Sequence, residues 1–213
     1  MLPRPKHVAN IGLRCVAATS KMVLETYFPE GPVLTFRMID QITRKELNKA
    51  VWRETFTKAE LDAGCRIHTV STWNMSEFIA RRWDYLRERL GAEATEWQIR
   101  NAPDMDYVID CMRALKGDNR LSYDYRAATT DDIRHHLSQG AYVALGINPA
   151  TLYDLSGDLG SLHRILIYGF IDDQIFIQDP DVGAQVVSVE RFMTAWMFGQ
   201  PEARALEAYY KGV

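Results

Sequence analysis

Three residues far apart in the chain carry the groups that a thiol nucleophile requires. Cys15 lies at the expected start of a helix, where unpaired N–H groups and the positive end of the helix dipole stabilise a thiolate. Such a nucleophile needs a base that keeps it ionised and later protonates the leaving group, and the base needs a third group to orient it. His163 and Asp179 have the side chains for these two roles. The set favours acyl transfer through a cysteine thioester.

The histidine and the aspartate lie on neighbouring predicted strands. His163 begins one strand and shares its side with Ile165, whereas Asp179 ends the next strand and shares its side with Ile177. If the turn between them has an odd number of residues, the two polar side chains become diagonal neighbours, roughly 7 to 8 Å apart by backbone. A two-residue turn at 172–173 would place them on opposite faces. The sequence does not decide whether the turn has an odd or an even number of residues.

Each candidate also has an ordinary structural interpretation. A free cysteine is often simply buried, a histidine at a strand start often makes only a hydrogen bond, and Asp-Pro-Asp turns are common without catalysis. Cys65 and Cys111 are expected to be packed core residues. His135 and His136, at the end of a helix, are expected to be solvated, because adjacent helical residues point apart and make a poor metal pair.

The elements that position these residues follow from apolar spacing. A helix is predicted over 15–27, after an extended lead-in over 1–13. Ser188 is expected to cap a closing helix that packs on the sheet. The loop 153–161 before His163 is either a lid or an ordinary surface loop. Strands joined by short turns, typical of an antiparallel sheet, are predicted over 141–147, 163–171, 174–178 and 185–188.

Composition restricts the class of protein. The chain has 213 residues, 47% hydrophobic and 25% charged, which suits a single globular domain. A formal net charge of -3 without a basic run argues against nucleic-acid binding. The sequence shows neither a signal peptide nor a membrane span, and its 3 cysteines lack the spacing of a zinc or disulfide framework. We therefore expect a cytoplasmic protein without membrane, cofactor or metal, and its oligomeric state is left open.

Motifs at both ends of the chain follow the order found in a known family. They are Cys15-x-x-Ala18-x-x-x-Met22-Val-Leu24, Gly140-x-x-Val143, His163-x-Ile165-x-Ile167-x-Gly169, Ile177-x-Asp179-Pro180 and Phe192-x-x-x-Trp196. With these motifs the chain resembles the papain-like cysteine peptidases that process bacteriocin (double-glycine) leaders, and their stand-alone relatives. Residues from about 36 to 128 match only loosely and are expected to form a helical insertion, within which the alternation over 65–70 suits a short strand imperfectly.

The resemblance implies an α+β, papain-like fold in one domain over 1–213. A helical half with Cys15 would pack on an antiparallel sheet that carries His163 and Asp179. Cys15 would be the nucleophile, His163 the general base and acid, and Asp179 the group that orients His163. The backbone N–H of Cys15 would help to bind the oxyanion.

Two positions beside the nucleophile depart from the family pattern. Relatives usually carry a glutamine six positions before the cysteine and a glycine after it, where this chain has Ala9 and Val16. The side-chain amide of Asn10 is expected to replace the missing oxyanion donor. Loss of one such donor costs about 10²- to 10³-fold in rate, but thioester formation remains possible.

Three functions are compatible with these residues. The preferred one is a thiol hydrolase that cleaves a peptide or other small amide through an acyl-cysteine. An acyltransferase or transamidase would use the same thioester with an amine as acceptor, and a catalytically inactive papain-like domain would only bind a peptide. Hydrolysis and transfer depend on whether a pocket holds the acceptor and excludes water, which the sequence does not reveal.

Overall fold

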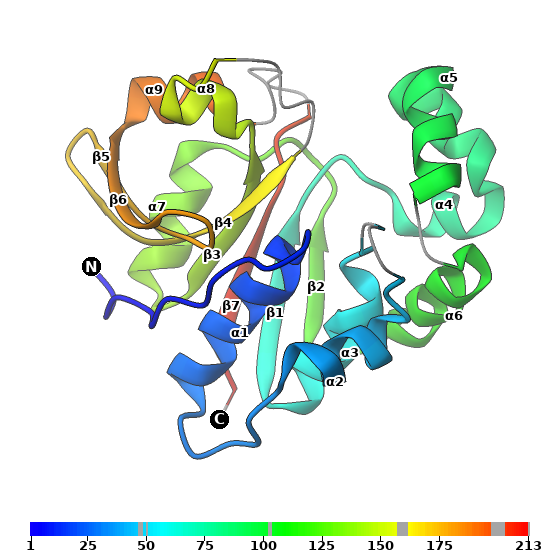
Figure 1. The fold of residues 1–213 in the computed structure, drawn as a ribbon, viewed down its shortest axis with the longest axis horizontal. Coiled ribbons are helices and arrows are strands. Elements are labelled where there is room, and N and C mark those ends of the chain that lie inside the picture. Colours follow the sequence, from blue (N-terminus) through cyan, green and yellow to red (C-terminus); the bar gives the residue numbers. More distant parts are fainter. Residues whose placement is uncertain (47–48, 50, 102–103, 157–161, 197–202, 213) are drawn as a thin grey trace.

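The computed structural model describes residues 1–46, 49, 51–101, 104–156, 162–196 and 203–212. Within them, seven strands form one sheet in the order β2-β1-β7-β3-β4-β5-β6 (Figure 1). Neighbouring strands are antiparallel except β1 and β2, which are parallel. The strands are β1 (Cys65–Val70), β2 (Leu121–Asp124), β3 (Tyr142–Ile147), β4 (His163–Ile171), β5 (Gln174–Asp179), β6 (Gly183–Ser188) and β7 (Leu206–Lys211).

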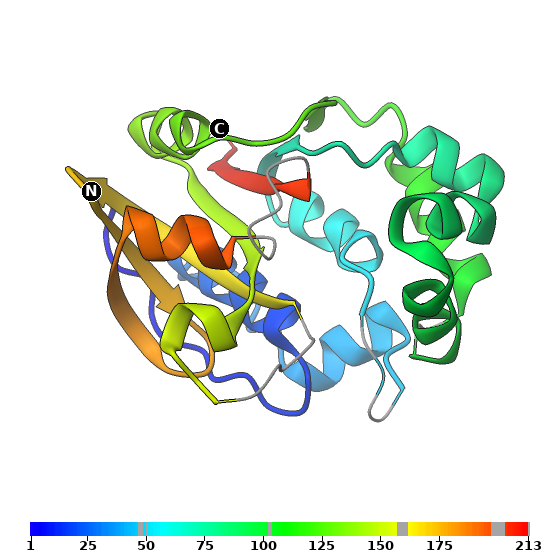
Figure 2. The ribbon, with the colours of Figure 1, turned by 90° about the horizontal axis from the view of Figure 1, so that it is seen from above.

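Helices cover both faces of this sheet, and α4 to α6 gather beside its β2 edge (Figures 1 and 2). Helix α1 packs on one face and α7 to α9 on the other. In the described part of the chain, no helix has the length and apolar character needed to cross a bilayer. The helices are α1 (Cys15–Tyr27), α2 (Phe36–Thr43), α3 (Glu54–Asp62), α4 (Met75–Arg81), α5 (Trp83–Asn101), α6 (Met105–Leu115), α7 (Thr130–Ser138), α8 (Pro149–Tyr153) and α9 (Val189–Ala195).

The α+β class is confirmed, but the prediction of an antiparallel C-terminal sheet is wrong in two respects. The short strand expected over 65–70 is β1, but it belongs to the same sheet and pairs in parallel with β2, which was not predicted. β7 was not predicted, although it lies between β1 and β3 inside the sheet. Its short run of Leu206 to Lys211 contains adjacent tyrosines, which blur the alternation that marks a strand.

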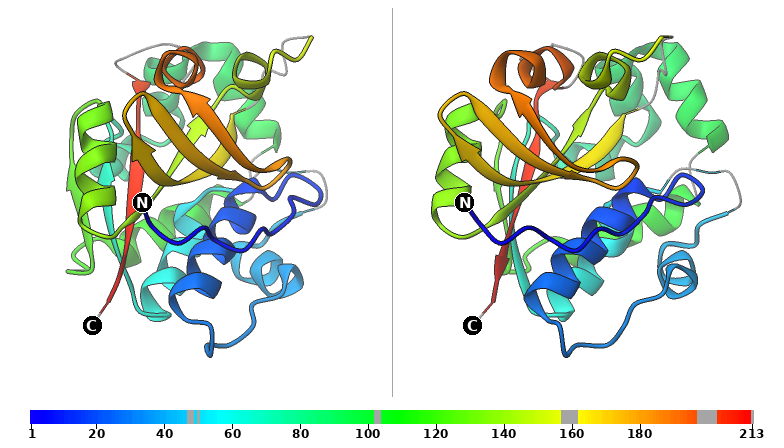
Figure 3. Two further views of the ribbon diagram at one scale, coloured as in Figure 1. Left: turned by 90° about the vertical axis from the view of Figure 1, so that its left-hand side faces the viewer. Right: turned by 60° about the vertical axis from the view of Figure 1, so that its left-hand side comes forward.

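The helix over 15–27 is confirmed, and the lead-in before it is extended as predicted. Two backbone hydrogen bonds fix this lead-in along β4 and β5 (Figure 3). The N–H of Leu2 donates to Tyr168 O over 2.9 Å, and the N–H of Asn10 donates to Pro180 O over 2.8 Å. The second bond brings the start of α1 to the turn that follows Asp179.

A β-bulge in the β4–β5 hairpin decides whether His163 and Asp179 lie on the same face of the sheet. Ile171 pairs with Gln174, so the turn has two residues, and a regular ladder would place His163 and Asp179 on opposite faces. The register shifts by one residue at Tyr168. Because of this extra residue, each β4 side chain beyond the bulge lies on the opposite face, relative to β5, from the one that a regular ladder would give it.

The shifted register determines what lies opposite Asp179. Leu166 pairs with Gln178, and continuing this ladder places Asp179 opposite Ile165. His163 is two residues further along the same strand face, so it is the diagonal neighbour of Asp179. The bulge therefore has the effect that the sequence argument assigned to an odd turn.

The two histidines at the end of α7 differ from the expectation that both are solvated. His135 is exposed, but His136 is 6% exposed and its Nδ1 lies 2.6 Å from Tyr210 OH. Burial and the nearby His68 and His135 lower the pKa of His136 to about 4. Cys65 is buried as predicted, whereas Cys111 is only half-buried.

The buried histidine predicts an acid-sensitive stability. The pKa of His136 is about 4 in the folded protein and about 6.5 in the unfolded chain, so the unfolded chain binds the proton first as the pH falls. The contribution of the neutral His136 to the free energy of unfolding is complete above about pH 6.5. As the pH falls towards 4, this contribution declines by at most about 1.4 kcal/mol per pH unit. We expect His136→Gln to reduce the pH dependence of the urea unfolding free energy in this window. His135→Gln is the matched control and should change the pH dependence much less, because burial and not His135 is the main cause of the lowered pKa of His136; identical curves for both variants would contradict the assignment.

Candidate active site

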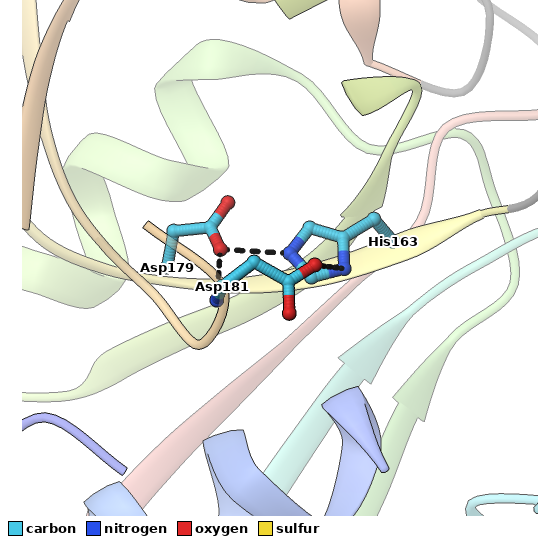
Figure 4. Close-up of side chains that lie close together, drawn as sticks. All are labelled: His163, Asp179 and Asp181. Atoms are coloured by element: carbon cyan, nitrogen blue, oxygen red, sulfur yellow. Dashed lines mark hydrogen bonds and ion pairs between the residues drawn. The ribbon is translucent and has the colours of Figure 1, made fainter. Parts of the chain in front are cut away.

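The structure brings Cys15, His163 and Asp179 together where α1 and β4 begin and β5 ends. His163 Nε2 lies 2.8 Å from Asp179 Oδ1, and the Cys15 thiol is close enough to His163 for each group to shift the pKa of the other. Because Asp179 occupies Nε2, the nitrogen that serves the sulfur is Nδ1. Figure 4 shows the imidazole on β4 with Asp179 at one ring nitrogen. Imidazole and carboxylate are therefore in contact, and the thiol lies beside the imidazole, in the order that the sequence argument requires.

Asp179 is fully buried and held by four donors. Its Oδ1 accepts hydrogen bonds from His163 and from the backbone N–H groups of Asp181 (2.6 Å) and Val182 (3.4 Å). Its Oδ2 accepts a hydrogen bond of 2.6 Å from Tyr153 OH, at the end of α8. Burial would raise the pKa of Asp179, but the bonds and the charge of His163, with Tyr153 and Asp181, lower it. The carboxylate is therefore a fixed anion.

Cys15 and His163 shift each other towards the charged forms. Burial would raise the pKa of the half-buried Cys15 thiol, but the hydrogen bond from His163, the backbone N–H of Arg164 and their charges lower it. Burial would lower the pKa of His163, but Asp179 and Cys15 raise it. The lowered pKa of the thiol and the raised pKa of the imidazole both favour a thiolate–imidazolium pair.

A second carboxylate faces the same imidazole. Asp181 Oδ2 lies 3.5 Å from His163 Nδ1, on the opposite side of the ring from Asp179 (Figure 4). Asp181 is exposed, so water screens its charge far more than that of Asp179. Asp181 therefore lies beside the nitrogen that serves Cys15, but it does not take over the role of the buried Asp179.

The chain before Cys15 makes a strained turn. Gly12 and Leu13 have φ values of 66° and 58°, in the left-handed region that costs a non-glycine residue about 1 kcal/mol or more. Asn10 Oδ1 accepts a hydrogen bond of 2.6 Å from the backbone N–H of Arg14, which closes this turn. The predicted oxyanion donor thus sits beside the start of α1 with its amide oxygen engaged. Within the described residues its Nδ2 has no hydrogen-bond acceptor, so its role as an oxyanion donor stays a prediction.

A buried ion-pair network lies behind the nucleophile and joins β4, α3 and β7. The backbone N–H of Arg164 is among the groups that lower the pKa of Cys15, and the Arg164 guanidinium forms an ion pair with Glu207. Arg53 Nε lies 2.7 Å from Glu207 Oε1, and Tyr209 OH accepts a hydrogen bond of 3.2 Å from Arg164. These side chains are at most 14% exposed. The network fixes the strand that presents its N–H to the sulfur.

Among the residues that the structure describes, one group at this site could hold a metal. The ligand atoms of His163, Asp179 and Asp181 lie within 4.8 Å of one another. Both oxygens of Asp179 already accept hydrogen bonds from protein donors, and these donors compete with a metal for the carboxylate. These contacts favour an acid–base role for the group.

A hollow on the described part of the molecule lies away from these residues. It has a volume of about 520 Å³ between β1, β2 and α7, and its lining includes His68, His136 and Tyr210. None of the three candidate catalytic residues lines it. The residues that sequence reasoning missed near Cys15 are Tyr153, Arg164, Asp181 and Glu207. Part of the predicted lid, 157–161, lies outside the described residues.

The two carboxylates beside His163 provide a matched pair of variants. We expect Asp179→Asn to slow alkylation of Cys15 by iodoacetamide at about pH 6 by about tenfold or more, because a charge-assisted hydrogen bond contributes about 1.5–3 kcal/mol. Asp181→Asn makes the same chemical change at an exposed carboxylate and should alter the rate less than about twofold. Rates are measured by mass spectrometry of the Cys15 peptide. Equal effects of the two substitutions would contradict the role given to Asp179.

Comparison with known proteins gives no relative from which a function can be transferred. No protein-family model matches the chain, and no curated protein matches it. The function proposed below rests on the residues and contacts described above.

Proposed function

We propose that the protein is a thiol hydrolase that cleaves a peptide or other amide through an acyl-Cys15 intermediate. The observation that carries this proposal is the 2.8 Å hydrogen bond between His163 Nε2 and Asp179 Oδ1, with the Cys15 thiol beside the same imidazole. The directions of both pKa shifts support an ionised pair near neutral pH. Ordinary core cysteines behave differently, since burial raises the pKa of Cys65 to about 12.

Acylation begins with attack of the Cys15 thiolate on the carbonyl carbon of the amide. The C–S bond forms, and the carbonyl π electrons move to oxygen. The backbone N–H of Cys15, at the first position of α1, has no acceptor within the helix and is available for this oxyanion. His163 then delivers its Nδ1 proton to the amide nitrogen, the C–N bond breaks, and the amine leaves.

Deacylation reverses the proton flow. Neutral His163 accepts a proton from water at Nδ1 while the water oxygen attacks the thioester carbon. The C–S bond breaks, the acid product leaves, and the thiolate–imidazolium pair is restored. Asp179 holds the ring in one orientation throughout and remains ionised. An amine that attacked instead of water would make the same site a transferase.

The papain-like fold is part of this proposal. A helix that begins at the cysteine, packed on a sheet whose neighbouring strands carry the histidine and the aspartate, supports it. Ala9 is exposed and Val16 is half-buried. Both side chains are apolar, so neither supplies a polar group to the site. We propose Asn10 as the side-chain oxyanion donor for this reason.

Thiol reactivity tests the proposal directly. We expect the rate of Cys15 alkylation by iodoacetamide to follow a pKa below the ordinary value of about 8.5. His163→Ala should raise this pKa and slow alkylation at about pH 6 by at least about tenfold. His135→Ala, at an exposed histidine on α7, is the control. An ordinary thiol pKa that does not depend on His163 would remove the catalytic assignment.

Acyl transfer is tested with p-nitrophenyl acetate as an artificial acyl donor. Intact mass spectrometry should detect an acetyl-enzyme that is absent in Cys15→Ala, and acetate should be released in water. Addition of glycinamide distinguishes the two reactions, because a transferase would form N-acetylglycinamide in preference to acetate. Failure to acetylate Cys15 in the wild type would favour the peptide-binding alternative.

A further inference from the structure

The hollow between β1, β2 and α7 has the size of a site for a small molecule. Its volume of about 520 Å³ falls within the range of about 300–1,000 Å³ that is typical of such sites. None of Cys15, His163 and Asp179 lines it, so a ligand bound here would be separate from the candidate active site. The hydrogen-bonding groups that line the hollow indicate which ligand it suits.

Most of the charges around the hollow are already paired within the protein. Arg126 donates two hydrogen bonds to Asp132, of 2.6 and 2.8 Å, and lies 3.4 Å from Asp124. Arg120 forms an ion pair of 2.7 Å with Asp118. These contacts neutralise two of the three arginines that line the hollow in the described structure, and both of its lining carboxylates.

Arg66, on β1, is the remaining arginine of the lining. It has no carboxylate partner in the described part of the chain, and its guanidinium carbon lies 5.9 Å from the centre of the Tyr210 ring. A cation–π contact at this distance is weak and uses none of the N–H donors of the guanidinium. The Arg66 side chain is exposed, so its N–H groups can bind an anion without disturbing the core.

His136, on α7, provides a second donor. It is 6% exposed, and its Nδ1 lies 2.6 Å from Tyr210 OH. Because the described residues offer this hydroxyl no other acceptor, we assign it as the donor to Nδ1. Near neutral pH the ring is uncharged, since burial and the neighbouring histidines lower its pKa to about 4, and its single proton then lies on Nε2. Among the described residues Nε2 has no hydrogen-bond partner, so this N–H can donate to a ligand.

Tyr210 holds these two donors beside each other. It is the cross-strand partner of Arg66 in the β1–β7 ladder, and its hydroxyl binds His136. The ring of His68 lies 5.1 Å from that of His136, and its Nδ1 is occupied by Ser122 Oγ at 2.8 Å. An anion in the hollow would therefore meet free N–H groups from a strand and from a helix.

We propose that this hollow binds a small organic molecule through a phosphate group held by Arg66 and by Nε2 of His136. A phosphate group has three terminal oxygens in a tetrahedral arrangement, which suits donors that approach from two different elements. A carboxylate has two coplanar oxygens and is satisfied by one guanidinium. The volume of the hollow exceeds that of a bare anion, so the ligand is a phosphate ester and not inorganic phosphate. The proposal does not depend on the reaction of Cys15.

Titration with phenyl phosphate, followed by NMR of the histidine side chains, tests this binding. Ionic strength is held constant with sodium chloride. We expect saturable shifts of the His68 and His136 imidazole signals, whereas those of His7, which does not line the hollow, should not move. Benzoate and inorganic phosphate, which each lack one part of the ligand, should bind more weakly. Absence of saturation by phenyl phosphate up to about 10 mM would overturn the proposal, and so would equal affinity for benzoate.

Two arginine variants separate a specific site from a general effect of charge. Arg66→Gln should raise the Kd for phenyl phosphate by about tenfold or more, because it removes a charge-assisted hydrogen bond. Arg100→Gln removes the same charge from an exposed arginine on α5 that does not line the hollow, and should change the Kd less than about twofold. Equal effects of the two substitutions would overturn the proposal.

A third variant tests the histidine donor. His136→Phe keeps a planar ring but removes Nε2–H, and should raise the Kd for phenyl phosphate by about threefold or more, measured from the His68 signals. Circular dichroism and urea unfolding establish that the variant is folded. Wild-type affinity in the folded variant would contradict the assignment of His136 as a donor. If the variant does not fold, the comparison of Arg66→Gln with Arg100→Gln still decides whether the hollow is a phosphate site.

Discussion

The hydrogen bond between His163 Nε2 and Asp179 Oδ1 determines which nitrogen of the imidazole can serve Cys15. Asp179 is itself held by Tyr153 and by two backbone N–H groups, so the ring orientation is fixed from three separate segments. A mobile imidazole would share its proton among solvent, Asp181 and the sulfur. The buried carboxylate removes most of that freedom, and the electrostatics of the site follow from it.

Local patterns in the sequence predict the parts of the site but not their assembly. The helix that begins at Cys15 is visible in its apolar spacing, and β4 and β5 are visible as apolar runs bounded by turns. The relative face of His163 and Asp179 depends on the bulge at Tyr168, for which the sequence has only a weak signal, the glycine at 169 inside the strand. Because strand periodicity is two, one extra residue decides the arrangement.

The contacts around Cys15 that sequence reasoning missed are all long-range. Glu207 and Arg53 are separated by most of the chain, and their ion pair exists only because β7 lies near α3 in the folded protein. Charged residues in a predicted surface helix or an unrecognised strand look solvated until their neighbours are known. His136 illustrates the same limit, since Tyr210 on β7 is the partner that accounts for its burial.

The position of β7 links the candidate site to the order in which the chain becomes available for folding. β7 follows every other strand in sequence but is the hydrogen-bonded bridge between β1 and β3. During synthesis, the hairpins from β3 to β6 can form early, whereas the two parts of the sheet can join only after residues 206–211 have left the ribosome. Glu207 arrives with them, so the ion pair that anchors Arg164 behind the sulfur is completed late. A nascent chain therefore carries Cys15 without its finished electrostatic surroundings until the sheet closes.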